Sequence, residues 1–193
     1  RIIETEIAQH FHVSRTVVRD VLGRLQERGL VRKNQSSHWV AGPLTAHSIR
    51  ERYELRRILE PAALLDAASQ TDRELLAALR DRAEAASGRD DAGGWEEIEA
   101  AFLELCVLTA PNSQLVEAIR HNQLPLRAAN RLLGQLGLPS DRAAVSEVRM
   151  VIDLLLSDAV RPAAEFWRDH LAMAERRSIA RLKIVAVIPE PQR

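Results

Sequence analysis

The amino-acid sequence predicts a mainly α-helical protein, with an N-terminal winged helix-turn-helix that carries a small β-hairpin and a larger, all-helical second part. Three observations support this fold class. Ala, Leu, Arg and Glu, which favour helix, dominate the 193 residues. Residues 1–41 contain signals for a short helix, a turn, a second helix and a hairpin, in that order. After residue 45, apolar residues recur at helical spacing between breaks that contain Pro or Gly.

The first element is a short helix expected over residues 4–10, followed by a turn over 11–13. Ser14 is a favourable N-cap for the second helix, which is expected to run to about Arg28. Gly29 supplies the stop that many helix ends require. The buried side of the second helix is expected to carry five apolar residues, namely Val17, Val18, Val21, Leu22 and Leu25.

Two short strands are expected over residues 30–33 and 38–41, around a polar tip at 34–37. We therefore expect a winged head over 1–41, a linker over 42–45, a helical domain over 46–183 and an irregular tail over 184–193. The first expected helix of this domain runs over 45–60, and Pro61 opens or kinks the next turn, through Ser69. A second helix starts at a capping box at Thr71 and ends near Gly88, and after a loop at 90–94 a third runs over 95–110. The remaining helices are expected from Ser113 to 137–139 with a kink at Pro125, from a cap at Ser140 to Leu156, and from a cap at Asp158 to about Lys183.

Charge is unevenly distributed along a chain whose net charge is zero. Residues 1–40 hold seven Lys or Arg and four Asp or Glu, so the head is basic and its expected partner is a polyanion. No apolar run reaches the length of a membrane span, and the N-terminal residues do not resemble a signal peptide. The lone Cys106 excludes an internal disulfide, so we expect a cytoplasmic protein.

A helix, a tight turn and a capped second helix form a helix-turn-helix, in which the second helix enters the DNA major groove by its N-terminal turns. Those turns present Ser14, Arg15, Thr16 and Arg19. An arginine donates two parallel hydrogen bonds to guanine, and hydroxyls at a helix start suit phosphate oxygens. The hairpin would bring Arg32, Lys33 and His38 to the DNA backbone or minor groove. Alternatively, these side chains are a cap and a solvated surface, but the order of signals within 40 residues favours DNA reading.

Residues 7–22, with Leu25 and 27–31, resemble the GntR family of regulators. The resemblance lies in Val13-Ser14-Arg15-Thr16, Arg19 and Leu22, which match the recognition-helix signature and imply DNA contacts by Arg15, Thr16 and Arg19. Two positions depart from many members, because Thr5 stands in place of an arginine and Ser36 in place of a wing glycine. The family's first helix is expected to precede Arg1.

Residues 46–183 resemble the FCD sensor domain of FadR-type GntR regulators. The matching residues are Tyr53-Glu54-Leu55-Arg56-Arg57, Leu59-Glu60-Pro61, Phe102, Asn112 and His170-Leu171. The resemblance implies an antiparallel helical bundle that binds a small organic acid and forms a homodimer, so that two heads read a palindromic operator in double-stranded DNA. Arg56 is the expected carboxylate-binding residue, with a surface role as the alternative.

Many FCD domains bind a divalent metal, and the resemblance places the four ligand positions at Glu99, Leu103, Val148 and His170. Leucine and valine cannot donate a lone pair, so we expect no tightly bound metal. The helical spacing of their neighbours places Glu99 and His170 inside the domain. Three roles remain open for this pair: hydrogen bonding within the core (to each other, a buried arginine or a water), effector binding, or a weak metal site.

The sequence contains no Gly-rich phosphate loop, nucleophile elbow or HExxH helix, and we expect no enzymatic activity. Cys106 lies in an apolar segment, where thiols are usually unreactive. The predicted function is effector-modulated, sequence-specific DNA binding. The alternative is a helical ligand-binding or interaction module with little remaining effector or DNA response.

Overall fold

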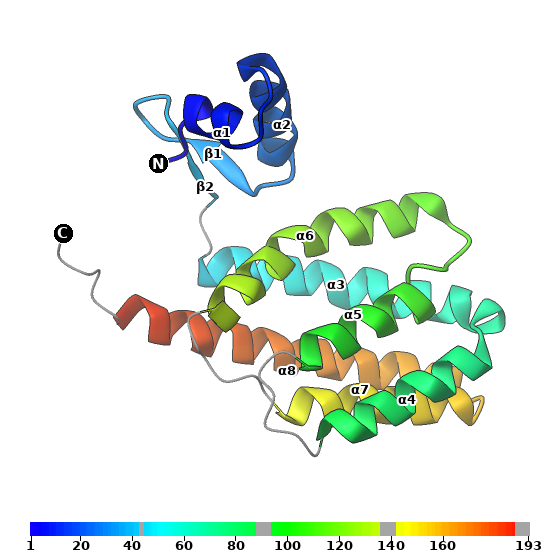
Figure 1. Ribbon diagram of the computed structural model, residues 1–193. Helices are drawn as coiled ribbons and strands as arrows, with labels where there is room; N and C mark the ends of the chain where they lie inside the picture. Colours follow the sequence, from blue (N-terminus) through cyan, green and yellow to red (C-terminus); the bar gives the residue numbers. More distant parts are fainter. Residues whose placement is uncertain (43–44, 88–93, 136–141, 188–193) are drawn as a thin grey trace.

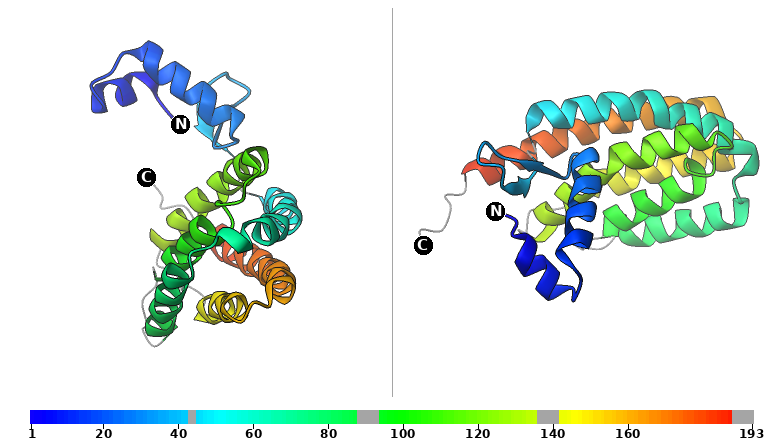
Figure 2. Two further views of the ribbon diagram at one scale, coloured as in Figure 1. Left: turned by 90° about the vertical axis from the view of Figure 1, so that its right-hand side faces the viewer. Right: turned by 90° about the horizontal axis from the view of Figure 1, so that it is seen from above.

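The computed structural model describes residues 1–42, 45–87, 94–135 and 142–187. Two short strands and a set of helices make up the fold, in the order α1 Glu4–His10, α2 Arg15–Glu27, β1 Val31–Lys33, β2 Trp39–Ala41, α3 Ala46–Ala67, the 3₁₀ turn η1 Ala68–Gln70, α4 Arg73–Ser87, α5 Gly94–Cys106, α6 Ser113–Gln135, α7 Arg142–Leu156 and α8 Val160–Val187. Figures 1 and 2 show the head, made of α1, α2 and the hairpin, at one side of the helical domain and next to α6. The predicted fold class is confirmed.

The head forms because local signals fix where α2 begins and ends. The Ser14 side chain accepts a hydrogen bond from the Val17 amide at 3.3 Å, as an N-cap does. Gly29 has a φ of +72°, the left-handed conformation that ends many helices. The chain then returns as the antiparallel pair β1 and β2, in which Val31 lies opposite Ala41.

A small separate core holds the head together. It is made of five buried residues, Ala8, Val18, Leu22, Val31 and Trp39. Our expectation that Val17 and Val21 are buried is wrong, because they are 48% and 46% exposed. The reason is that α2 packs on one side only, against α1 and β1, so neighbouring positions point away from the core.

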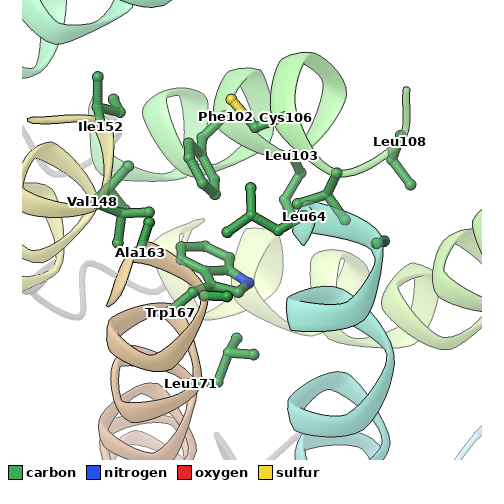
Figure 3. Close-up of a cluster of buried hydrophobic side chains, with 14 of the residues drawn as sticks. Leu64, Phe102, Leu103, Cys106, Leu108, Val148, Ile152, Ala163, Trp167 and Leu171 are labelled. Carbon is green, nitrogen blue, oxygen red and sulfur yellow. The ribbon is translucent and has the colours of Figure 1, made fainter. Parts of the chain in front are cut away.

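The helical domain is built from antiparallel neighbours, with α3 beside α8, α4 beside α7, and α7 beside α8. Its core surrounds Trp167, which is fully buried and lies 4.6 Å, centroid to centroid, from the ring of Phe102 (Figure 3). Cys106 is also fully buried, and this burial raises the pKa of its thiol to about 12. Within the described ranges, no helix combines the length and apolarity needed to cross a membrane.

Helix α3 continues through Pro61 to Ala67 instead of opening at the proline. Proline has no N–H to donate to the carbonyl four residues earlier, which belongs to Arg57. Arg168 of α8 donates its Nε–H to that carbonyl at 3.4 Å. A contact between two helices therefore takes the place of a bond within one.

Several helix ends differ from the sequence expectations. Asp72, and not Thr71, caps α4, because its Oδ1 accepts from the amides of Glu74 and Leu75 while the Thr71 hydroxyl donates to the Ala67 carbonyl. Helix α5 ends at Cys106, four residues early, and the Leu108 amide closes it by bonding to the Leu103 carbonyl.

The start and end of α8 also differ. Asp158 does not cap this helix, which begins at Val160, because Asp158 takes a φ of +59° and its carboxylate pairs with Arg73 at 2.7 Å. Residues 184–187, expected to be irregular, continue α8. The expected features at 43–44, 88–93 and 136–141, with the Ser140 cap, and the tail over 188–193 lie outside the described residues.

Candidate functional site

The first candidate site is the N-terminal end of α2, which stands free of the helical domain (Figure 1). Ser14, Arg15, Thr16 and Arg19 are all exposed there. The side chains of Arg15 and Arg19 are 59% and 63% exposed. The structure therefore brings these four predicted residues together on one accessible surface, next to the free amide groups of a capped helix start.

Glu4 of α1 lies against this surface, and the sequence analysis did not single it out. Its Oε2 accepts a hydrogen bond from Arg19 Nε at 2.8 Å and lies 3.7 Å from a terminal nitrogen of Arg15. Its Oε1 accepts from Trp39 Nε1 at 3.1 Å. The hydrogen bond from Arg19 is the main reason that the pKa of Glu4 is lowered. No sequence signal marked this role, because Glu4 and Arg19 lie 15 residues apart.

The wing carries the other predicted DNA contacts. Arg32, Lys33 and His38 are exposed, and the ammonium of Lys33 lies 5.0 Å from the centroid of the Trp39 ring. The Asn34 side chain organises the tip by accepting hydrogen bonds from two amides, those of Ser36 and His38. Ser37, and not Ser36, takes the left-handed conformation, with a φ of +58°.

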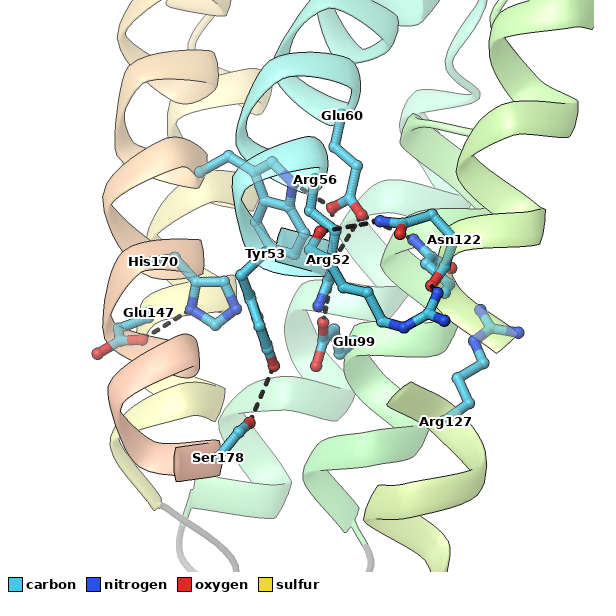
Figure 4. A network of polar contacts seen from close by, with 12 residues as sticks. Arg52, Tyr53, Arg56, Glu60, Glu99, Asn122, Arg127, Glu147, His170 and Ser178 are labelled. Atoms are coloured by element: carbon cyan, nitrogen blue, oxygen red, sulfur yellow. Dashed lines mark hydrogen bonds and ion pairs between the residues drawn. The ribbon is translucent and has the colours of Figure 1, made fainter. Parts of the chain in front are cut away.

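The second candidate site is a buried polar network centred on Arg56 of α3 (Figure 4). Arg56 donates its Nε–H to Glu60 at 2.6 Å, and one terminal nitrogen donates to both Glu60 at 3.2 Å and Glu99 at 2.8 Å. Glu60 also accepts from Gln123 of α6 at 2.9 Å and from Trp167 of α8 at 3.0 Å. Helices α3, α5, α6 and α8 therefore all contribute a side chain to this network around the Arg56 guanidinium.

Burial and charge oppose each other in this network. Burial alone lowers the pKa of Arg56 and raises the pKa of Glu99. The attraction between unlike charges outweighs burial, so the net pKa of Arg56 is raised and that of Glu99 is lowered. The surface alternative for Arg56 is wrong, because the residue is 4% exposed. The carboxylates that it binds in this structure are the protein's own.

His170 belongs to a neighbouring contact between α7 and α8. Its Nδ1 lies 2.7 Å from Glu147 Oε2, and Arg177 donates two hydrogen bonds to the same carboxylate at 2.9 and 2.7 Å. The ring stacks on Trp167 with centroids 4.7 Å apart. Its Nε2 is buried and has no hydrogen-bond partner among the residues that the structure describes.

The predicted burial of Glu99 and His170 is confirmed, with 9% and 2% exposed. The sequence left open whether these two side chains bond to each other, to a buried arginine or to a water. Glu99 bonds to the buried Arg56, and no hydrogen bond joins Glu99 to His170. From the sequence, Glu60 was named only as part of the FCD match and given no role, and Glu147 was missed. The spacing of four residues between Arg56 and Glu60 was an available signal, whereas nothing local pointed to Glu147.

The four metal-ligand positions implied by the family resemblance do not offer a suitable donor set. Leu103 and Val148 are 3% and 1% exposed and belong to the apolar core (Figure 3). Glu99 is bonded to Arg56, and His170 offers one nitrogen. Across the described part of the chain, no group of three or more His, Cys, Asp or Glu side chains is placed to hold a metal ion.

A cleft of about 480 Å³ opens beside the buried network, between α5 and α6. Arg56, Glu99 and Leu103 contribute to its lining, as does Leu30 of the head. Arg127 and Arg131 of α6 and Glu96 and Glu97 of α5 supply further charges to the lining. Residues of the Arg56 network and one residue of the head therefore line the same cleft.

Known protein families match both parts of the chain. Residues 51–173 match the FCD domain, and residues 1–40 match the bacterial regulatory proteins of the gntR family. The Nta operon transcriptional regulator of Aminobacter aminovorans is 31% identical over 122 residues, which are 62% of this chain and 58% of that protein. An uncharacterized HTH-type transcriptional regulator from the TAR-I ttuE-ttuC' intergenic region of Agrobacterium vitis is 37% identical over 115 residues, 55% of this chain and 66% of that protein.

The chain therefore spans about three fifths to two thirds of the length of these two relatives. The crystal structure of a transcriptional regulator from Pseudomonas syringae pv. tomato, a GntR family member, resembles this structure with a TM-score of 0.61 and 24% identity. The match covers 94% of this chain and 76% of that one. At this level of identity, the likeness establishes the fold.

Proposed function

The chain belongs to the GntR family of bacterial regulatory proteins and carries an FCD domain, and from this premise we propose that it is a sequence-specific DNA-binding transcription regulator. We propose that its binding to a palindromic operator is modulated by a small organic acid held in the helical domain. A regulator of this kind acts where the chromosome is, which makes it a cytoplasmic protein. It carries out no catalysis of its own.

One observation carries the DNA-binding part of this proposal. The capped start of α2 exposes Ser14, Arg15, Thr16 and Arg19 on a single surface that projects away from the helical domain. The two arginines can donate to guanine edges, and the helix start and hydroxyls can donate to phosphates. Arg32, Lys33 and His38 are exposed on the wing, where they could contact the DNA backbone.

The effector part of the proposal rests on the cleft beside Arg56. An organic acid that enters it would meet the positive charges of Arg127 and Arg131 and would compete with Glu99 for the Arg56 guanidinium. His170 does not line this cleft, but its buried Nε2 has no hydrogen-bond partner among the described residues and could take one from a ligand. We propose Arg56, Glu99 and His170 as effector-binding residues on these grounds.

We further propose that the domain holds no tightly bound metal, because Leu103 and Val148 occupy two of four ligand positions. We also propose a homodimer. One short recognition helix makes too few base contacts for specificity, so two heads must act together across a palindrome.

One observation favours a second candidate function. Arg56 is already bonded to both Glu60 and Glu99, so the domain has satisfied its main internal cation without any ligand. In this second candidate function, the helical domain serves dimerisation or partner binding and responds weakly to organic acids. DNA binding by the head would remain.

The test is a selection experiment on the whole chain. Wild-type protein is used to enrich sequences from a random double-stranded DNA library, and the enriched duplex is then titrated with and without a panel of mono- and dicarboxylic acids. Enrichment of a palindrome, and a change in Kd on adding one acid, support the proposed function. Recovery of no preferred sequence contradicts DNA reading, whereas an unchanged Kd with every acid favours the second candidate.

A further inference from the structure

Glu4 is a carboxylate placed on the surface that is proposed to meet DNA. A negative charge there is repelled by phosphates and weakens binding to any sequence. Yet Glu4 does not point into solvent, since its side chain is 19% exposed while the Arg15 and Arg19 side chains beside it are 59% and 63% exposed. Its position beneath the two arginines is better explained by its contacts with their guanidinium groups than by its repulsion of phosphates.

The contact between Glu4 and Arg19 uses the Nε–H of the guanidinium and leaves its two terminal nitrogens available. Arg19 donates its Nε–H to Glu4 Oε2 at 2.8 Å. The recognition of guanine by arginine uses two parallel N–H donors directed at O6 and N7. With Nε held by Glu4, the two terminal nitrogens of Arg19 remain for that end-on contact. A held guanidinium also loses less side-chain entropy when it binds.

Arg15 does not receive the same support. Its terminal nitrogen lies 3.7 Å from Glu4 Oε2, which is beyond hydrogen-bond distance. The two arginines, four positions apart on α2, therefore differ in how firmly their guanidinium groups are oriented before DNA binds. Arg19 is held in one orientation, and Arg15 stays adaptable.

The other oxygen of Glu4 connects this arrangement to the wing. Oε1 accepts a hydrogen bond from Trp39 Nε1 at 3.1 Å, and Trp39 is buried in the head core on β2. The Trp39 ring also lies 5.0 Å from the Lys33 ammonium on β1. One carboxylate thus links the recognition helix to the strand that carries the wing.

We propose that Glu4 is a positioning residue for DNA reading, which orients Arg19 toward one base pair and fixes the wing relative to α2. This proposal rests on the proposed DNA-binding function. It has an unusual electrostatic consequence. Removing Glu4 lowers the preference for the correct base, while binding to unrelated DNA becomes as tight as before or tighter because a negative charge is lost.

The experiment uses the whole chain and the duplex that the wild-type protein enriches from a random library. The variants are Glu4→Ala, Arg19→Ala, the double variant, and Glu6→Ala as the matched control, because Glu6 is an exposed carboxylate of the same helix. Kd is measured at one salt concentration for the enriched duplex, for each single base-pair change in it, and for a scrambled duplex. Circular dichroism melting checks that each variant is folded. If Glu4→Ala does not fold, Glu4→Leu replaces it, since leucine fills much of the same volume and has no oxygen to accept the hydrogen bond from Arg19.

The expected result is local to one base pair. Glu4→Ala should lower the preference about fivefold or more at the same base pair that Arg19→Ala affects. The double variant should lose no more there than Arg19→Ala alone. Glu6→Ala should leave every base preference unchanged.

Three outcomes would overturn the proposal. A folded Glu4 variant that keeps the wild-type preference removes the positioning role. A loss spread evenly over all base pairs shows a general structural role instead. If the wild-type protein enriches no sequence at all, the proposed function fails first and this proposal fails with it.

Discussion

Glu147 of α7 and His170 of α8 are joined across the helix interface by a contact of 2.7 Å between Oε2 and Nδ1. Arg177, two turns further along α8, donates two hydrogen bonds to the same carboxylate. The imidazole is therefore fixed in orientation by a charged partner, and its buried Nε2 is directed away from that partner.

Acid should weaken the protein through Glu147. Burial raises the pKa of this carboxyl, but the hydrogen bonds from His170 and Arg177 lower it to about 2, against an ordinary 4.5. A lowered folded-state pKa means that the stabilisation is complete above about pH 4.5 and is lost as the pH falls toward 2. Urea unfolding of wild type and Glu147→Gln should show a difference at pH 7 that shrinks over this range. A constant difference down to pH 2 would contradict the assignment.

Removing Arg56 should destabilise the helical domain strongly. Arg56→Met leaves Glu60 and Glu99 buried without their cation, and the loss of one partner from a buried ion pair costs about 3–5 kcal/mol. Arg57→Met is the matched control, because its pair with Glu175 is partly exposed and should cost about 1 kcal/mol or less. Denaturant unfolding measures both. Equal effects of the two substitutions would show that the buried network adds no stability.

The protein should contain no stoichiometric metal. Leu103 and Val148 cannot coordinate an ion, so elemental analysis after purification without added metal should find less than one equivalent of zinc, nickel or manganese, and a chelator should leave Tm unchanged. The double substitution Leu103→His and Val148→His is the positive control and should gain metal-dependent stability. Stoichiometric metal in the wild type would refute the expectation. No response from the double variant would show that the four positions do not face one another.

Arg15 and Arg19 should carry base recognition. Replacing either one by Ala should cost about 1–3 kcal/mol on the enriched duplex and much less on a scrambled duplex. Arg24→Ala is the control, because Arg24 lies near the far end of α2 and pairs with Asp20 at 3.1 Å. Equilibrium titration by fluorescence anisotropy measures each Kd. Wild-type binding by both folded variants would show that the recognition surface lies elsewhere.

The protein should be a dimer at micromolar concentration. Two heads are needed to read two half-sites one helical turn of DNA apart, about 34–36 Å. Sedimentation equilibrium should give twice the chain mass of 21.6 kDa. A monomer at that concentration, both alone and with the enriched duplex, would contradict the proposal.

The order and the boundaries of the elements in the head could be predicted from the sequence, because they are set by local chemistry. Ser14 caps α2 and Gly29 ends it as expected, since both depend on conformations available to a single residue. The burial of Val17 and Val21 was predicted wrongly. Apolar spacing indicates that a helix is amphipathic, but what packs against it decides how wide its buried face is.

The interior of the helical domain was predictable only in part. Helical spacing correctly placed Glu99 and His170 inside, since burial follows from the neighbours on the same helix. Their partners did not follow, because Arg56 is 43 residues from Glu99, and Glu147 is 23 residues from His170 on another helix. Which helices lie side by side is a property of the folded chain. The sequence shows many acidic and basic residues, but it does not show which of them pair in the folded domain.

Pro61 has a mechanical consequence for the first helix after the head. Its missing N–H leaves the Arg57 carbonyl to Arg168, and further polar contacts join α3 to α8 on both sides of that point. These contacts are Tyr53 with Ser178, Arg57 with Glu175, and Glu60 with Trp167. Sliding α3 by one helical turn, about 5.4 Å, would break all of them at once. These contacts therefore resist a slide of α3 along α8, whereas a tilt of the two helices together as one unit would keep every one of them.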